Sequence, residues 1–176
     1  ASPPRPFDLH AHTAPLALEV TTADGPLIVN CGWNDGQGRH WRDSMRATAA
    51  HSTLILGGRS AGVFLDKGIG AKLLGTAISR SAGPATSSRR EQEAGTWVEA
   101  AHEGYIPPFG LAHRRRLYMN ILGADVRGED SVFVPLGQAP LTRDEIPFKI
   151  RFHLHPSVKV TLAQDRQSAL LIQPGR

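Results

Sequence analysis

Cysteine is nearly absent from this sequence, whose 176 residues include a single one, Cys31. One cysteine cannot form a disulfide within the chain, which excludes a disulfide scaffold and a cysteine-based zinc finger. Long apolar runs are missing too, because glycine, proline or charge cuts each one before it could cross a bilayer. Aromatic residues make up only 6% and no nucleic-acid-binding motif occurs, so neither a membrane nor a nucleic acid is expected as a partner.

Lysine is also scarce, which makes arginine the main cation. Twenty lysines and arginines against sixteen aspartates and glutamates give a net charge of +4. Arginine suits bidentate contacts to carboxylate, sulfate or phosphate, so an anionic partner is favoured. The length and a hydrophobic content of 40% fit one globular domain over residues 1–176. Because the chain begins with Ala1 and ends just after a strand-like run, we expect a piece of a longer protein.

Short apolar or alternating runs, separated by Gly, Pro, Asn and Asp, predict an all-β fold, an antiparallel β-sandwich. The expected strands are residues 16–20, 26–30, 53–56, 73–79, 96–102, 115–120, 131–134, 148–155, 158–162 and 169–173. In the strand over residues 148–155, the alternation places four apolar residues on a face expected to meet the core, namely Phe148, Ile150, Phe152 and Leu154. Helical spacing is confined to residues 41–50, while the polar stretches 81–90 and 125–130 are expected to be a connection and a turn.

Two of the eight histidines, His10 and His12, are separated by one residue. On a strand this spacing puts both rings on one face, where two imidazoles can hold a metal ion, serve a groove or simply face solvent. A cupin-type metal site is disfavoured, since Glu19 lies seven residues beyond His12, farther than that pattern places its glutamate.

Three segments occur in a recognisable order. His10-Ala-His12 runs into an apolar stretch, a second apolar stretch ends at Asn30-Cys31-Gly32, and Arg46-Ala-Thr48-Ala-Ala-His51 follows. In this order they resemble the β-sandwich half of the heparinase II/III family of polysaccharide lyases. Further runs at 101–105, 110–117, 127–130 and 152–156 extend the resemblance over nearly the whole chain. It implies a supersandwich-like β-sandwich placed C-terminal to a helical α/α toroid, which would be its partner domain.

The resemblance also implies a reaction, the β-elimination of acidic polysaccharides that contain uronic acid. That chemistry needs a neutralised carboxylate, a base for the adjacent proton and an acid for the leaving oxygen. His10 matches the family histidine that faces the cleft and transfers protons. The family's tyrosine and neutralising group come from the toroid, so this chain alone is expected to be inactive. A periplasmic or secreted location is suggested by the resemblance alone.

A zinc ion is the one cofactor that the resemblance implies, with His12, His51 and Asn30 at the positions of its ligands. The family has an aspartate where this chain has Asn30, and another where it has Ala14. Asparagine offers a dication no charge and a single carbonyl oxygen, so zinc is expected to bind weakly or not at all.

Substrate contacts are expected from the basic run His113-Arg114-Arg115-Arg116 and from Tyr105. Alternation on a strand directs Arg114 and Arg116 to one face and Arg115 to the other, so at most the first two act together on an acidic sugar. Tyr105 is expected to line a cleft or, as the more common role of a strand-end tyrosine, to pack. The alternative to a lyase is a β-sandwich module that binds anionic glycans without cleaving them.

Overall fold

The chain folds as an all-β structure in the computed structural model, which describes residues 9–33, 36–65, 68–69, 71, 76–83, 85–123 and 125–174. The strands are β1 Val20–Thr22, β2 Gly25–Val29, β3 Leu54–Leu56, β4 Val63–Phe64, β5 Ile78–Arg80, β6 Ala85–Gln92, β7 Gly95–His102, β8 Ala112–Asn120, β9 Val126–Phe133, β10 Phe148–Ile150, β11 His153–Leu154, β12 Lys159–Leu162 and β13 Ala169–Ile172. The helical elements are α1 Arg39–Met45, the 3-10 turn η2 Thr48–Ala50 and α3 Ile106–Phe109. The all-β sandwich prediction is confirmed. In the described part of the chain, no helix has the length and apolar character needed to span a membrane.

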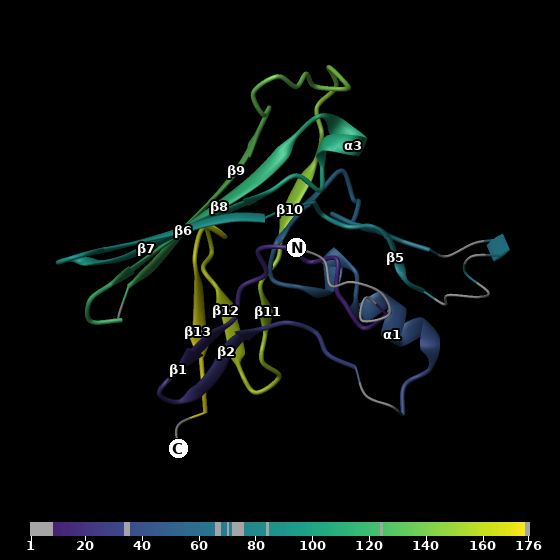
Figure 1. The fold of residues 1–176 in the computed structure, drawn as a ribbon. Coiled ribbons are helices and arrows are strands. Elements are labelled where there is room, and N and C mark those ends of the chain that lie inside the picture. Colours follow the sequence, from purple (N-terminus) through teal and green to yellow (C-terminus); the bar gives the residue numbers. More distant parts are fainter. Residues whose placement is uncertain are drawn as a thin grey trace.

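The largest sheet has the order β6-β7-β8-β9, with every neighbouring pair antiparallel. Figure 1 shows it lying across one side of the molecule, above β1, β2, β12 and β13. Two sequence predictions are wrong here, since both polar stretches belong to strands of this sheet: much of residues 81–90 is in β6, and most of residues 125–130 is in β9. β6 is exposed along its whole length and Ala85 is its one apolar residue, so this edge strand gives no hydrophobic alternation by which to recognise it.

Smaller sheets form the second part of the sandwich, in the orders β1-β2-β11, β10-β3, β12-β13 and β4-β5. The single strand expected over residues 148–155 is divided, because the chain pairs first with β3 as β10 and then with β2 as β11. Phe148 and Phe152 are more than half exposed, so this predicted core face is wrong. The strand expected over residues 73–79 falls partly outside the described residues, and its described end is in β5.

The short helix predicted over residues 41–50 is present, but it ends at Met45 and is followed by η2. At the break, the buried Arg46 side chain donates hydrogen bonds to the carbonyl oxygens of Ala11 and Thr76, at 2.8 and 2.7 Å. The backbone N–H of Thr13 in turn donates to the carbonyl of Arg46 at 2.9 Å. One buried arginine therefore fixes the segment that carries His10 and His12.

The core is small and lies between β3 and the turn before α3. Its buried members are Leu54, Leu56, Ala61 and Tyr105, with Ala82, Phe109, Leu111 and Ile146 packed against them. The Tyr105 hydroxyl donates to the carbonyl of Leu54 at 2.9 Å, so its polar end is satisfied inside the core. Gly110 ends α3 with φ 74°, a left-handed conformation that glycine adopts without strain.

Candidate functional site

The structure brings His12 and His51 together, although 39 residues separate them in sequence. His51 follows η2, and its Nδ1 lies 2.9 Å from the carbonyl oxygen of Ala47. A carbonyl only accepts, so Nδ1 carries the proton and Nε2 presents a lone pair. His12 Nδ1 lies 2.6 Å from that Nε2, and therefore donates to it. The two rings form one directed hydrogen-bonded pair.

Both members of the pair are held in the neutral form. Burial lowers the pKa of His12, and the nearby positive charge of Arg46 lowers it further. Burial also lowers the pKa of His51, against a smaller opposing effect of its hydrogen bond to Ala47. Neutral imidazoles are what both a hydrogen-bonded pair and a metal site require.

The residues around the pair do not fit a zinc ion held by three protein ligands. Two nitrogens bound to one tetrahedral zinc ion lie about 3.3 Å apart, whereas His12 Nδ1 and His51 Nε2 are 2.6 Å apart. The side-chain oxygen of Asn30 accepts the backbone N–H of Ser52 at 2.8 Å, and its amide donates to Glu19 at 2.9 Å. Among the described residues, no group of three His, Cys, Asp or Glu side chains is placed to share a metal ion. Asn30 thus acts as a bridge between two segments.

Cys31 and His153 make a second contact beside the pair. His153 Nε2 lies 3.1 Å from the carbonyl of Ala49 and donates to it, which leaves Nδ1 free to accept from the Cys31 thiol at 3.4 Å. Burial raises the pKa of that thiol, so the thiol form is favoured. These two side chains are already partners of one another.

His10 differs from His12 because its side chain is exposed. The two do not share a strand face as expected, since residues 9–12 do not form a strand. The backbone beside His10 is nevertheless fixed, because Arg46 binds the carbonyl of Ala11 and His12 binds His51. The result is a solvent-facing imidazole on an anchored segment.

The basic run alternates in the way that a strand requires. Arg115 is buried, Arg116 lies on the opposite face and pairs with Glu99 at 3.0 Å, and the Arg114 guanidinium lies over the Phe133 ring at 5.6 Å. Tyr105 is completely buried. In this position it is a packing residue, with no surface left to contact a substrate.

A buried chain of polar side chains was missed by the sequence analysis. His102 Nδ1 accepts the N–H of Gly104 at 3.1 Å, so its Nε2 carries the proton and donates to His113 Nδ1, also at 3.1 Å. His113 Nε2 then donates to Asp130 at 2.7 Å. Burial lowers the pKa of His102 to about 3. The cross-strand pairing of β7 with β8 places the two histidines opposite one another, a register that residue types alone did not reveal.

Arg115 joins this chain to the histidine pair. Its guanidinium binds both oxygens of Asp130, at 2.8 and 2.9 Å, and one of its nitrogens also donates to the carbonyls of Leu16 and Ser52. Burial would raise the pKa of Asp130, but the hydrogen bonds from His113 and Arg115 outweigh it and lower the pKa. Ser52 directly follows His51, so the four-stranded sheet is tied to the segment that carries the pair.

Comparison with known proteins gives a family for this arrangement. Residues 1–176 match the family model described as heparinase II/III-like, C-terminal. The chain is also 34% identical over 178 residues to FtsZ-localized protein C of Caulobacter vibrioides (strain NA1000 / CB15N), a match that covers 98% of this chain and 30% of that protein. No solved structure matches the chain. The family's description as C-terminal implies a partner domain on the N-terminal side. The chain belongs to the heparinase II/III-like C-terminal domain family.

Proposed function

We propose that this domain is the β-sandwich part of a polysaccharide lyase that cleaves uronic-acid-containing glycans by β-elimination, with His10 as its proton-transferring residue. The observation that carries the proposal is the contrast between two neighbouring histidines. His12 is fixed in a hydrogen bond to His51, while His10 faces solvent on the same anchored segment. Family membership supports a role related to polysaccharide lyases.

The chemistry of this site needs a group that accepts or delivers a proton near neutral pH, and an imidazole has the appropriate ordinary pKa. His10 supplies that group. Arg46 positions His10, because its hydrogen bond to the carbonyl of Ala11 limits where the His10 ring can reach. The group that neutralises the uronate carboxylate and the tyrosine that completes proton transfer would come from the N-terminal partner domain. No step passes through a metal.

The test is turnover by the intact protein, followed as the ultraviolet absorbance of the unsaturated uronate product with heparin, heparan sulfate and alginate as substrates. His10→Ala should lower turnover about 10²–10⁴-fold, the usual contribution of a general acid or base. His40→Ala, which removes another exposed histidine, is the matched control and should leave turnover unchanged. The 176-residue chain by itself should show no turnover.

The relative's name describes localisation with FtsZ and states no reaction, so the same assay also tests the competing role of a non-catalytic module. Wild-type turnover in the His10→Ala protein would refute the assignment of this residue. No turnover of any uronate polymer by the intact wild-type protein would favour the module.

A further inference from the structure

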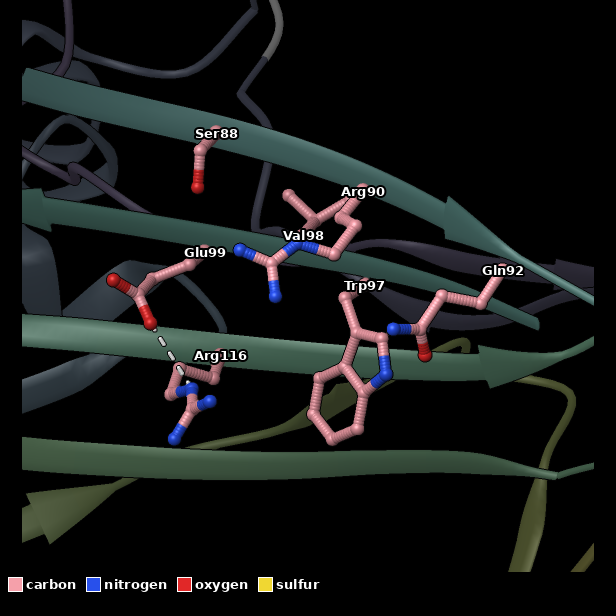
Figure 2. A pocket seen from close by; sticks show the side chains of 7 residues that line it. All are labelled: Ser88, Arg90, Gln92, Trp97, Val98, Glu99 and Arg116. Carbon is pink, nitrogen blue, oxygen red and sulfur yellow. Dashed lines mark ion pairs between the residues drawn. The ribbon is translucent and has the colours of Figure 1, made fainter. Parts of the chain in front are cut away.

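A hollow lies on the face of the β6-β7-β8-β9 sheet that points away from the histidine pair. Arg115 reaches the pair's segment from one face of β8, so its neighbour Arg116 points to the other. The hollow measures about 180 Å³, less than a pocket for a whole drug-sized ligand, and so has room for one unit of a chain. Its lining residues are Ser88, Arg90, Gln92, Trp97, Val98, Glu99 and Arg116 (Figure 2).

The floor of the hollow is the indole of Trp97, which keeps 38% of its surface exposed. Tyr118, its partner across β7 and β8, supports it with ring centroids 4.8 Å apart, and the Arg116 guanidinium lies 5.6 Å from the indole centre. These neighbours hold the ring in place while leaving much of it open to solvent. A rigid, half-open indole is a platform for the apolar face of a flat ligand.

The wall of the hollow carries a cation without an acidic partner. Arg90 lies opposite Trp97 on β6, and within the described ranges no carboxylate is at ion-pair distance from it. The two nearby arginines differ, since Arg116 pairs with Glu99 at 3.0 Å and Arg89 pairs with Glu91 at 2.5 Å. The hollow therefore has one uncompensated positive charge beside an aromatic surface. Figure 2 shows Arg90 next to Trp97, with Gln92 on the other side of the indole.

We propose that this hollow binds one acidic sugar unit of an anionic polysaccharide. The indole would carry the carbon face of the sugar ring, and the Arg90 guanidinium would pair with its carboxylate or sulfate. Ser88, Gln92 and the Glu99 carboxylate offer hydrogen-bonding groups that match ring hydroxyls. The proposal does not depend on catalysis by His10, because the hollow lies on the opposite face of the sheet and its test is binding.

Two other ligands fit the hollow less well. An acidic peptide that adds a strand would pair with the free edge of β6, whereas the hollow lies on the face of the sheet, so the main chain of such a peptide would not cover the Trp97 indole. A single-stranded nucleic acid needs several cations along its backbone, whereas the hollow offers one free cation with the Glu99 carboxylate close by. One cation and one platform correspond to one acidic sugar unit.

The experiment is isothermal titration of the intact protein with a heparin-derived hexasaccharide and with hexagalacturonate, using maltohexaose as the neutral probe. The acidic probes should bind and maltohexaose should not, and added salt should weaken binding because the contact is partly ionic. Trp97→Ala and Arg90→Gln should each lower the affinity for the acidic probes about tenfold or more. Arg89→Gln, which removes the neighbouring paired arginine on the same strand, should leave it unchanged. His10→Ala should also leave this affinity unchanged.

Arg90→Gln changes only an exposed side chain, so it keeps the test decisive if Trp97→Ala unfolds the protein. The proposal is overturned if neither acidic probe binds, if maltohexaose binds equally well, or if Arg90→Gln and Arg89→Gln have the same effect. Tighter binding of a dT12 oligonucleotide that Arg90→Gln abolishes would assign the hollow to nucleic acid instead. Loss of lyase activity in His10→Ala with binding retained would show that the two sites are separate.

Discussion

Acidification should destabilise the domain through His102, a residue that the proposed reaction does not use. Both ring nitrogens of His102 are engaged, one accepting from Gly104 and the other donating to His113. A second proton on Nδ1 would face the Gly104 N–H, which is itself a donor. Burial and the neighbouring His113 lower the pKa of His102 from 6.5 to about 3.

The size of the effect follows from the two pKa values. Because the folded-state pKa of about 3 lies below the unfolded value of 6.5, the folded chain binds fewer protons in the interval between them. The stability contributed by His102 is therefore complete above about pH 6.5 and is lost as the pH falls toward 3. Between pH 7 and pH 5 the loss comes to about 2 kcal/mol, or about 4–8 °C in Tm for a chain of this length.

Urea unfolding of the wild type and of His102→Gln at pH 7 and pH 5 measures this loss. Glutamine can still accept from Gly104 and donate toward His113, but it does not titrate. The wild type should lose about 2 kcal/mol more than the variant between the two pH values. Ser88→Ala, on the exposed face of the same sheet, should behave as the wild type. An equal loss in wild type and His102→Gln would refute the reasoning.

Three further outcomes are expected. Gly110→Ala should lower Tm more than Gly123→Ala in thermal melts. Both glycines have φ near 70°, but only at Gly110 would an added Cβ collide with backbone, at the carbonyl oxygen of Ala139. Equal shifts in Tm would contradict this. His51→Ala should cost about 1–3 kcal/mol in urea unfolding, since it leaves His12 and the carbonyl of Ala47 without partners, and an unchanged midpoint would count against the pair. Adding zinc chloride should leave Tm unchanged, because Asn30 already bonds Ser52 and Glu19; a concentration-dependent rise would show a zinc site.

The sequence predicted the positions of several strands well and those of the polar strands poorly. The strands expected over residues 96–102 and 115–120 lie within β7 and β8. β6 was missed, since an exposed edge strand made almost entirely of polar and charged residues has no hydrophobic face. Phe148 and Phe152 gave the opposite error. Their alternate spacing predicted a buried face, but both side chains are more than half exposed.

The sequence also predicted some parts of the candidate site and missed others. The meeting of His12 and His51 followed from the family resemblance, and the opposite directions of Arg115 and Arg116 followed from strand alternation. The buried chain from His102 to Asp130 could not be predicted, because it depends on the exact register of β7, β8 and β9. The hollow around Trp97 was missed for the same reason, since Arg90 was assigned to a connection and not to a strand beside the indole.

Two buried arginines fix the position of the segment before β1. Arg46 binds the carbonyl of Ala11 from the side of α1, and Arg115 binds the carbonyl of Leu16 from the side of the four-stranded sheet. Both contacts are to backbone oxygens, so they fix the path of the chain on either side of His12. A zinc ion on His12 and His51 would add a third constraint to a segment already held at two points. The two arginine contacts therefore hold His10 where the proposed reaction needs it, whether or not Asn30 takes part in binding a metal.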